Sequence, residues 1–512
     1  MQRVRMLSRR RLGGLLSLSK GRVGEVIRPR PMLQLALGIA LGISLVEWSA
    51  LPAAPSIVLG LVGFILALGL PAWAWLFIGL ALGAVRYDLW RQPPTQTPPS
   101  VATLCALGTL EPTRNGYRLL CAFEEPALPT YALVYFRSSV RHMPDYGDVF
   151  RVETTWRRPV RFSGFDWARY LERRRVYHIT TIFSEQQFEI LQSGAGRWQR
   201  RFSAARQSLR RTLRTHLRPE DAALMEGMLV GAAGDFPPAL REAFHRSGTG
   251  HLLATSGLHV MMALQMVYLL LRATPVPFAG RIAVVIAAAW CYALLAGLRP
   301  SIVRAATMTS VALCAPLLGR EADSLNALGF AGALWLLIAP HTIFEVGFQY
   351  SFCAVLFILL FYSKLEYAMR RGAMRLGALP AKGKPTALAG KVLQKGLIPL
   401  LSVSLCAQAG ISLVQLYHFG YLSLLAPVAN LLAVPMAYPT LAAGFWFWLS
   451  QGVGATVVGW LCAWQAWVAL TFGAEWVPAL RVASTPAWLP IACYAGVLLL
   501  APEPPLGEVE EL

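Results

Sequence analysis

The feature that most constrains the fold of this chain is the repetition of apolar segments between residues 32 and 502. With their flanks, these segments approach the roughly 20 residues that an α-helix needs to cross a bilayer. Three of them precede residue 90, at 32–46, 56–70 and 72–85. Beyond residue 218 we expect ten further helices, at 251–272, 281–297, 300–318, 324–340, 343–363, 396–415, 419–435, 437–452, 455–473 and 486–502. The sequence therefore predicts a polytopic α-helical membrane protein.

Composition supports a membrane protein, and the distribution of positive charge predicts its orientation. Hydrophobic residues make up 55% of the chain and charged residues 14%, which excludes an ordinary soluble domain. Residues 1–31 carry nine Arg or Lys and are predicted to be a basic cytoplasmic N-terminal tail. N-terminal transmembrane helices within 32–90 then take the chain to the outer side. Five later crossings bring it back to the inner side at 364–395, a segment with eight Lys or Arg and one Glu. A cleaved signal peptide, with its apolar part at 32–46, is the alternative for the first segment.

A polar region of different character interrupts the apolar segments. Residues 91–195 contain short alternating runs such as YALVYF (131–136) and DVFRVETTW (148–156), which are separated by turn residues. This alternation predicts the strands of a small barrel or sandwich. We expect an inserted all-β domain on the outer side of the membrane, because three crossings that start inside put residue 90 outside. The positive charge of the domain does not contradict this, since a long folded segment crosses regardless of its charge.

Arginine is concentrated in and after this β region. Between 137 and 218 there are eighteen arginines and no lysine, interleaved with aromatic residues such as Trp156 and Trp167. Guanidinium groups bind phosphate through paired donors and stack on bases, so the pattern favours contact with single-stranded nucleic acid. A solvated basic face, or attraction to anionic lipid headgroups, explains the same composition. The candidate DNA-binding residues are Arg157, Arg158, Arg161, Arg169, Arg173, Arg174 and Arg175.

Residues 196–218 predict an amphipathic interfacial helix. Its apolar residues fall on one stripe and its arginines lie opposite. We expect this helix to lie on the membrane with the stripe turned toward lipid. The stripe consists of Trp198, Phe202, Ala205, Leu209, Leu213 and Leu217.

The eight cysteines contain no CxxC pair and no Cys/His cluster at zinc spacing, so we expect no metal site. Cys105 and Cys121 lie symmetrically about the turn PTRNG, and we consider them a candidate disulfide across a hairpin. A disulfide requires that the domain lie outside the cytoplasm. A reduced buried pair is the alternative.

Polar residues gather where several predicted helices begin on the outer side. HLLATSGLHV (251–260), AGLRPSIVRA (296–305) and FEVGFQYSF (344–352) each start one helix. At 1.5 Å per residue their polar side chains lie at a similar depth, and ionisable residues within a membrane are functional candidates. The candidates for lining or gating a channel are His251, Ser256, Gly257, His259, Arg299, Ser301, Arg304, Glu345, Gln349 and Asn430.

Ser256 and His259 have a competing interpretation as a nucleophile and its base. The stretch ATSG is similar to the GxSG serine of rhomboid-type intramembrane proteases, but Ala254 replaces the leading glycine. No carboxylate nearby in the sequence would orient the imidazole. We therefore expect no enzyme activity and no catalytic residue, and we interpret Ser256 with Gly257 as a small pair that lets another helix approach. We also expect Arg304 to pair with Glu345.

Four ordered motifs carry a family resemblance. They are HRSGTGHLLATSGLHV, AGLRPSIVRA, VGFQYSF and YHFGYLSLLAPVANLLAVP, and they resemble the core of the ComEC family, the inner-membrane channel of natural competence. The β region, ending in SGFDWARYLERRRVY, also looks like that family's oligonucleotide-binding (OB) type domain. The resemblance covers roughly residues 30–500. It implies a periplasmic OB-like domain at 91–195 and a competence-type transmembrane channel domain at 219–502. Five further crossings after the basic segment are expected to leave the acidic tail at 503–512 outside.

The resemblance implies passage of single-stranded DNA from the periplasm to the cytoplasm during natural transformation. Many family members continue into a metallo-β-lactamase-like domain, whose HxHxDH motif is absent here, so we expect a separate nuclease. No GxxxxGK[ST] loop occurs, so the energy must come from a cytoplasmic motor or a gradient. The other expected partners are membrane lipids, a periplasmic DNA receptor and a cytoplasmic single-strand-binding protein, with no cofactor. A permease or lipid transporter without DNA specificity is the alternative, and an intramembrane serine hydrolase is less favoured.

Overall fold

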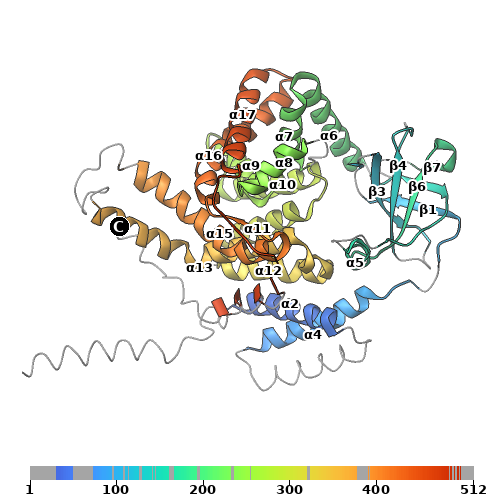
Figure 1. Cartoon of the computed structure of the whole chain (residues 1–512), viewed down its shortest axis with the longest axis horizontal. Helices are drawn as coiled ribbons and strands as arrows, with labels where there is room; N and C mark the ends of the chain where they lie inside the picture. The colour runs from blue at the N-terminus through green and yellow to red at the C-terminus, as the bar shows by residue number, and fades with distance from the viewer. Residues whose placement is uncertain are drawn as a thin grey trace, which may run out of the picture.

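The computed structural model describes residues 30–49 and 73–497 apart from short gaps, the longest of which are 161–165 and 377–389. It consists of a pair of N-terminal helices, a β unit and a bundle of helices (Figure 1). Among the described residues, six helices are long and apolar enough to cross a membrane, which agrees with the predicted polytopic class. They are Pro31–Trp48, Phe278–Leu295, Val346–Arg375, Leu393–Phe419, Ala426–Leu449 and Ala455–Phe472.

Several sequence predictions fall outside the described residues. They concern most of the N-terminal tail, the second apolar segment, the greater part of the last predicted helix and the acidic tail. The ranges are 1–29, 56–70, most of 486–502, and 503–512.

Helices α2 (Pro31–Ser49) and α4 (Ala74–Arg91) form a parallel pair in which two glycines of each helix face the other. A Cβ atom at any of these four positions would overlap the backbone of the opposite helix. The four-residue spacing places both glycines on one helix face, as in the small-xxx-small pairs of membrane helices. Backbone contact therefore brings the two helices together. The glycines are Gly38 and Gly42 in α2 and Gly79 and Gly83 in α4.

A seven-stranded sheet is present where the sequence predicts strands. Its order is β6-β4-β3-β1-β5-β7, with β2 beside β3, and its paired strands are antiparallel except for β4 with β6. Arg157, just after β5, forms a bridge with Ile179 of β6, and the hydroxyls of Thr154 and Thr180 meet at the same place. The sheet thus curls until β5 approaches β6. The strands are β1 (Val101–Ala106), β2 (Glu111–Thr113), β3 (Gly116–Phe123), β4 (Tyr131–Arg137), β5 (Val149–Glu153), β6 (Val176–Ile182) and β7 (Phe188–Gln192), and helix α5 (Trp167–Arg173) precedes β6.

The register of the sheet separates Cys105 from Cys121. Cys105 lies opposite Ala122, whereas Cys121 lies opposite Ala106. Because successive residues of a strand point to opposite faces, Cys121 enters the core and Cys105 lies on the other face. Both are free thiols in the structure. The predicted disulfide is therefore wrong, because an offset of one residue directs the two thiols to opposite faces.

We expect Cys105 to react with a maleimide in the native protein and Cys121 to react only after denaturation. Cys121 is fully buried, and burial raises the pKa of its thiol well above the ordinary value. Peptide mapping after labelling without reductant, with and without denaturant, checks this expectation. Cys121→Ser serves as the matched variant, since it should leave the labelling of Cys105 unchanged. A recovered peptide pair linked through the two sulfurs would contradict it.

Helix α6 (Arg197–His216) is amphipathic as predicted, but its apolar stripe packs on the bundle. Leu209 and Leu213 are fully buried in the main hydrophobic core of the helices. Arg206 is buried as well, and it donates to backbone carbonyls at the end of helix α10 (Phe278–Leu295). From Phe202 to Leu217, protein side chains cover the stripe, so its predicted burial in lipid is wrong over this part.

Segments distant in the sequence lie side by side in the bundle. Helices α16 and α17 pack beside α6 and α7 (Figure 1), and α12 packs on the N-terminal helix α2. This packing forms two large hydrophobic cores. The first is shared by α6, α7, α9 to α11, α16 and α17. The second lies between the α2–α4 pair, α12 and α13. The remaining helices are α7 (Pro219–Val230), α8 (Pro238–Arg246), α9 (Gly257–Arg272), α11 (Pro300–Leu317), α12 (Ser324–Ile338), α13 (Val346–Arg375), α15 (Ile398–Phe419), α16 (Ala426–Leu449) and α17 (Ala455–Phe472).

At Pro435 the sequence predicts a break between helices 419–435 and 437–452, but α16 continues through it. Proline removes a backbone donor and distorts the preceding turn. Carbonyls of that turn accept hydrogen bonds from side chains of α17, so the distorted backbone is satisfied by a neighbouring helix. The predicted break is therefore wrong. The pairs are Leu432 with Trp464 Nε1 at 3.2 Å and Ala433 with Gln465 Nε2 at 3.0 Å.

A short strand pair closes the same region. Strand β8 (Tyr421–Ser423), before α16, pairs with β9 (Ala479–Arg481), after α17. The two ends of the α16–α17 hairpin are thereby held together on one side of the bundle.

Candidate functional site

Helix α9 begins at Gly257 rather than at the predicted residue 251. Ser256 is its N-cap. Its backbone N–H donates to Nδ1 of His259 at 3.2 Å, and its hydroxyl, which lies 3.0 Å from the same nitrogen, accepts from the backbone N–H of His259. The two backbone N–H bonds are reciprocal and form a capping box with histidine in place of the usual acid or amide. Nε2 of His259 is buried without a hydrogen-bond partner among the described residues. The arrangement is thus a helix cap, without the acid that orients the histidine of a serine nucleophile.

The other residues predicted around this cap have different surroundings. His251 lies in the 3₁₀ turn η3 (Gly250–Leu252) and is exposed, whereas His259 is fully buried. A Cβ at Gly257 would meet Ala305 at 3.5 Å, an ordinary contact. Glycine is therefore not needed there for close helix approach, contrary to the prediction.

Residues of α11 tie α9 to α13. The hydroxyl of Ser301 donates to the carbonyl of Thr255 at 3.0 Å. Arg304 is 2% exposed and donates through Nη2 to the carbonyl of Gly347 at 2.9 Å. Its guanidinium also lies over two phenylalanine rings of α13, at 5.4 and 5.9 Å from their centroids. A buried guanidinium is stabilised by such acceptors and ring faces.

Gln349 extends these contacts to a further helix. Its Nε2 donates to the carbonyl of Ile343 at 2.8 Å, and its Oε1 lies 2.9 Å from Nε2 of His418 at the end of α15. Sequence reasoning missed His418, although the motif YHFG marked this connection. We use the name polar belt for the set Thr255, Ser256, Ser301, Arg304, Gln349 and His418.

Asn430 and Arg299 are predicted channel residues that contact other parts of the bundle. Asn430 donates to Oγ of Ser404 at 3.4 Å, between α16 and α15. Arg299 is the N-cap residue of α11, and its side chain lies against Gly231, which has a positive φ of 78° and leaves no room there for a Cβ. The polar belt thus contains four of the ten predicted residues, namely Ser256, Ser301, Arg304 and Gln349.

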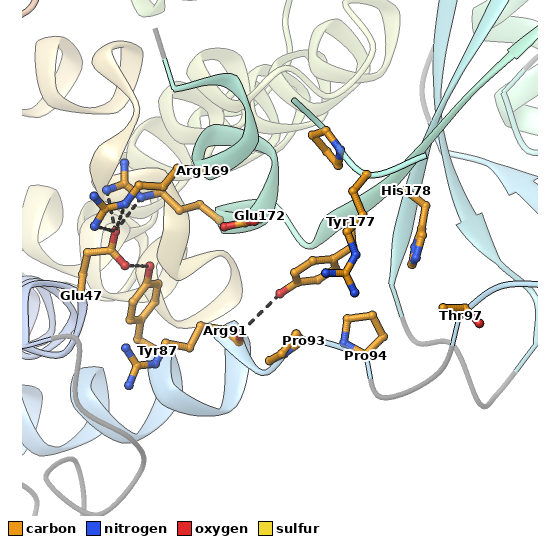
Figure 2. Close-up of a pocket in the computed structure, with 13 residues that line it drawn as sticks. Glu47, Tyr87, Arg91, Pro93, Pro94, Thr97, Arg169, Glu172, Tyr177 and His178 are labelled. Carbon is orange, nitrogen blue, oxygen red and sulfur yellow. Dashed lines mark hydrogen bonds and ion pairs between the residues drawn. The ribbon is translucent and has the colours of Figure 1, made fainter. Parts of the chain in front are cut away.

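A second polar cluster joins the β unit to the α2–α4 pair. Oε1 of Glu47 accepts from Nη2 of Arg169 at 2.8 Å and from Nη2 of Arg173 at 2.6 Å, and Oε2 accepts from the hydroxyl of Tyr87 at 2.7 Å (Figure 2). The Glu47 side chain is 10% exposed. The indole N–H of Trp90 adds a bond of 2.8 Å to the carbonyl of Arg173. Helix α5 is therefore docked on the ends of both N-terminal helices, and we use the name docking cluster for Glu47, Tyr87, Arg169 and Arg173.

Glu345 belongs to the same interface. Its Oε1 accepts from Nη2 of Arg174 at 2.6 Å and lies 3.7 Å from Nε2 of His341. Burial, and then the charge of Arg174, lower the pKa of His341 to about 3, so the imidazole is neutral and Arg174 supplies the counter-charge. The predicted pairing of Arg304 with Glu345 is wrong, because Arg304 donates instead to the backbone of α13.

The seven predicted DNA-binding arginines divide into three groups. Arg169, Arg173 and Arg174 bind carboxylates of the helices, and Arg175 lies over the ring of Trp90. Arg161 lies outside the described residues. Arg157 and Arg158 are exposed and line two separate pockets. Docking of the β unit thus accounts for four of the seven.

The pocket beside Arg158 lies between the β unit and the ends of α2 and α4 and has a volume of about 470 Å³. The groove beside Arg157 measures about 790 Å³ and is lined by the aromatic residues Tyr135, Trp167 and Phe183. Across the described part of the chain, no three His, Cys, Asp or Glu side chains gather as a metal site requires.

The fold and the two polar clusters define a multi-pass membrane protein that carries an arginine-rich β unit docked on its helices. Residues 228–503 match the family model described as Competence protein. The chain belongs to this family, which confirms the resemblance to ComEC.

Individual relatives support the same assignment. The chain is 27% identical over 274 residues to ComE operon protein 3 of Bacillus subtilis (strain 168), covering 53% of this chain and 31% of that protein. It is 29% identical over 191 residues to an uncharacterized protein of Aquifex aeolicus (strain VF5), covering 37% and 44%, and 26% identical over 327 residues to the uncharacterized protein YcaI of Escherichia coli (strain K12), covering 56% and 40%. The chain thus spans less than half the length of each relative. No solved structure matches it significantly.

Proposed function

We propose that this chain is a bacterial inner-membrane channel that passes single-stranded DNA from the periplasm to the cytoplasm during natural transformation. The observation that carries the proposal is the family match over the helices that hold most of the polar belt. A polyanion needs a water-lined route with cations near its mouth and no tight binding inside it. Arg304 places one guanidinium within the belt, and Arg157 and Arg158 of the β unit are exposed. A permease without DNA specificity would leave the groove that combines Arg157 with aromatic rings unexplained.

The β unit fits an OB-type domain. Strand β1 lies between β3 and β5, β4 runs parallel to β6, and the Arg157–Ile179 bridge brings β5 to β6. A partly open barrel of about five strands is the arrangement found in OB folds, which bind oligonucleotides. The groove of about 790 Å³ at this seam combines Arg157 with aromatic rings. Bases stack on such rings while arginine binds phosphate, so we assign this groove to the DNA strand.

Two features support a periplasmic β unit and a cytoplasmic N-terminus. The parallel α2–α4 pair agrees with an odd number of crossings before the β unit, and the basic segment 364–395, which begins within the C-terminal part of α13, agrees with an inner position of that helix end. The β8–β9 pair places the start of α16 and the end of α17 on the same side. Since α16 is one helix, a last crossing at 486–502 would leave the tail 503–512 in the cytoplasm, opposite to the sequence prediction.

The proposal assigns no catalytic step to this chain. Ser256 and His259 act as a helix cap, and strand degradation and force generation belong to other proteins. These partners are a periplasmic DNA receptor, a nuclease, and a cytoplasmic motor or single-strand-binding protein.

The test is uptake of labelled DNA in a strain that lacks this chain. We expect DNA to bind at the cell surface but not to reach a nuclease-resistant cytoplasmic state, and we expect the wild-type chain to restore entry. In the same assay, Arg304→Gln should restore entry at least about tenfold less well, since loss of one buried charge contact of roughly 1.4 kcal/mol changes a rate tenfold. Normal entry in the deletion strain would refute the channel proposal.

The matched control is Arg272→Gln at the exposed C-terminal end of α9, which removes the same charge away from the polar belt. It should restore entry fully. Membrane fractions probed by immunoblotting establish that both variants accumulate to the same level. If both variants restore entry equally well, Arg304 has only a structural role.

A further inference from the structure

The pocket beside Arg158 is bounded by two parts of the chain far apart in sequence. The docking cluster lies at one end, and His178 of β6 lies at the other, near Pro94 and Thr97 of the segment that leaves α4 (Figure 2). Its volume of about 470 Å³ exceeds that of several water molecules. The pocket can therefore hold a small polar group.

The lining of this pocket has an excess of positive charge. Four arginines face two carboxylates, those of Glu47 and Glu172. Arg169 and Arg173 are held by Glu47, and Arg91 is held by Asp88. Arg158 is exposed and forms no ion pair with any residue that the structure describes. Its guanidinium is the one that remains available for an anion.

His178 supplies a second available group. It is only 6% exposed, and its buried Nδ1 has no hydrogen-bond partner among the described residues. The rings of Phe123 and Trp156 pack edge-on against the imidazole and fix its position. Burial, and then the charge of Arg158, lower its pKa, so the ring is neutral and carries one N–H. Nδ1 itself is enclosed by protein, whereas Nε2 is not among the enclosed polar atoms, so an anion in the pocket would meet the imidazole at Nε2.

The position of the pocket indicates which kind of anion it can bind. It lies at the C-terminal ends of α2 and α4, and α2 is one of the helices that can cross a membrane. Trp48 follows Glu47 at this end and is 55% exposed. Exposed tryptophan at the end of an apolar helix is typical of the level of lipid headgroups. The available guanidinium and imidazole therefore lie where phosphates of the bilayer are found.

We propose that this pocket binds the phosphate of an anionic phospholipid headgroup, with Arg158 and His178 as its ligands. The proposal goes beyond DNA passage, because the ligand is a lipid and the site is separate from the groove at Arg157. A bound headgroup would contact the β unit and the α2–α4 pair together. The lipid would thus hold the β unit against the membrane alongside the docking cluster.

The test is native mass spectrometry of the purified full chain in detergent, without DNA, after addition of phosphatidylglycerol or phosphatidylcholine. We expect the wild-type chain to retain one phosphatidylglycerol in preference to phosphatidylcholine. Arg158→Gln should reduce that retention about five- to tenfold, as expected for one arginine near anionic lipid. His178→Gln should reduce it in the same direction.

Arg151→Gln is the control, because it removes an exposed arginine of β5 away from the pocket and should leave lipid retention unchanged. Equal retention by Arg158→Gln and Arg151→Gln would overturn the proposal. Displacement of the lipid by an equal concentration of inorganic phosphate or of a short oligonucleotide would overturn it too, and would assign the pocket to a free anion or to DNA. Because no uptake is measured, failure of the channel proposal would not affect this result.

Discussion

Gly79→Leu is expected to separate α2 from α4 and to destabilise the chain by more than about 3 kcal/mol, since added methylenes in a packed contact cost roughly 1–3 kcal/mol. A Cβ at Gly79 would overlap the carbonyl of Leu35, and the contact is with rigid backbone rather than with a flexible side chain. The two helices can accommodate leucine only by moving apart. Separation would also uncover the second core, which these helices share with α12 and α13. Thermal unfolding of the detergent-solubilised protein measures the change.

Gly372→Leu is the matched control for this prediction. Gly372 also lies within a helix, α13, but a Cβ there meets no atom within 4 Å. Leucine is a better helix former than glycine, so this variant should be at least as stable as the wild type. Equal stability of the two leucine variants would show that the α2–α4 contact does not hold the fold.

Glu47→Ala is expected to release the β unit from the helices. Glu47 accepts hydrogen bonds from two arginines and from Tyr87, and its removal leaves their charges and the hydroxyl without their acceptor. Removing one partner of a buried ion pair typically costs 3–5 kcal/mol. Arg169 is half exposed and therefore screened, so we expect about 2–3 kcal/mol of docking free energy to be lost. Hydrogen exchange of α5 should then become roughly thirty- to 150-fold faster, while the bundle stays protected.

Two controls separate this effect from a general loss of charge. Glu242→Ala breaks an exposed pair with Arg246 on α8 and should change exchange little. A double-mutant cycle with Arg173→Ala should show a coupling of at least 1 kcal/mol, because the two residues are in direct contact. Additive effects of the two substitutions would contradict the assigned ion pair.

The sequence predicted most of the helices, because apolar length and flanking charge are local properties. It placed Pro300 at the start of α11, as the structure has it. Errors arose where a distant segment supplies what the local sequence lacks. At Pro435, side chains of α17 satisfy the kinked backbone. The stripe of α6 has the pattern of a lipid-facing helix, but the bundle that covers it lies elsewhere in the sequence.

The depth of the candidate site in the bundle could be predicted from the sequence, but the hydrogen-bond partners of its residues could not. Motif position indicated that Ser256, Ser301, Arg304 and Gln349 lie at one depth, and hydrogen bonds now link several of them across three helices. The acceptor of Arg304 is a backbone carbonyl, which no residue pattern records. The partner of Glu345 comes from the β unit, 171 residues earlier in the chain. The excess of arginine is typical of a nucleic-acid-binding surface. Four of the seven candidate arginines, however, bind carboxylates or lie over Trp90 at the interface between the β unit and the helices.

The hydrogen bonds from α17 to the kinked turn of α16 also restrict how the bundle can change shape. A proline bend is often a point of flexion, but here indole and amide donors clamp the bend at the level of Leu432 and Ala433. The β8–β9 pair joins the segments that flank the start of α16 and the end of α17. We therefore expect α16 and α17 to move together as one rigid unit, so that any widening of a conduit must take place along their contacts with α6, α7, α8, α9 and α15.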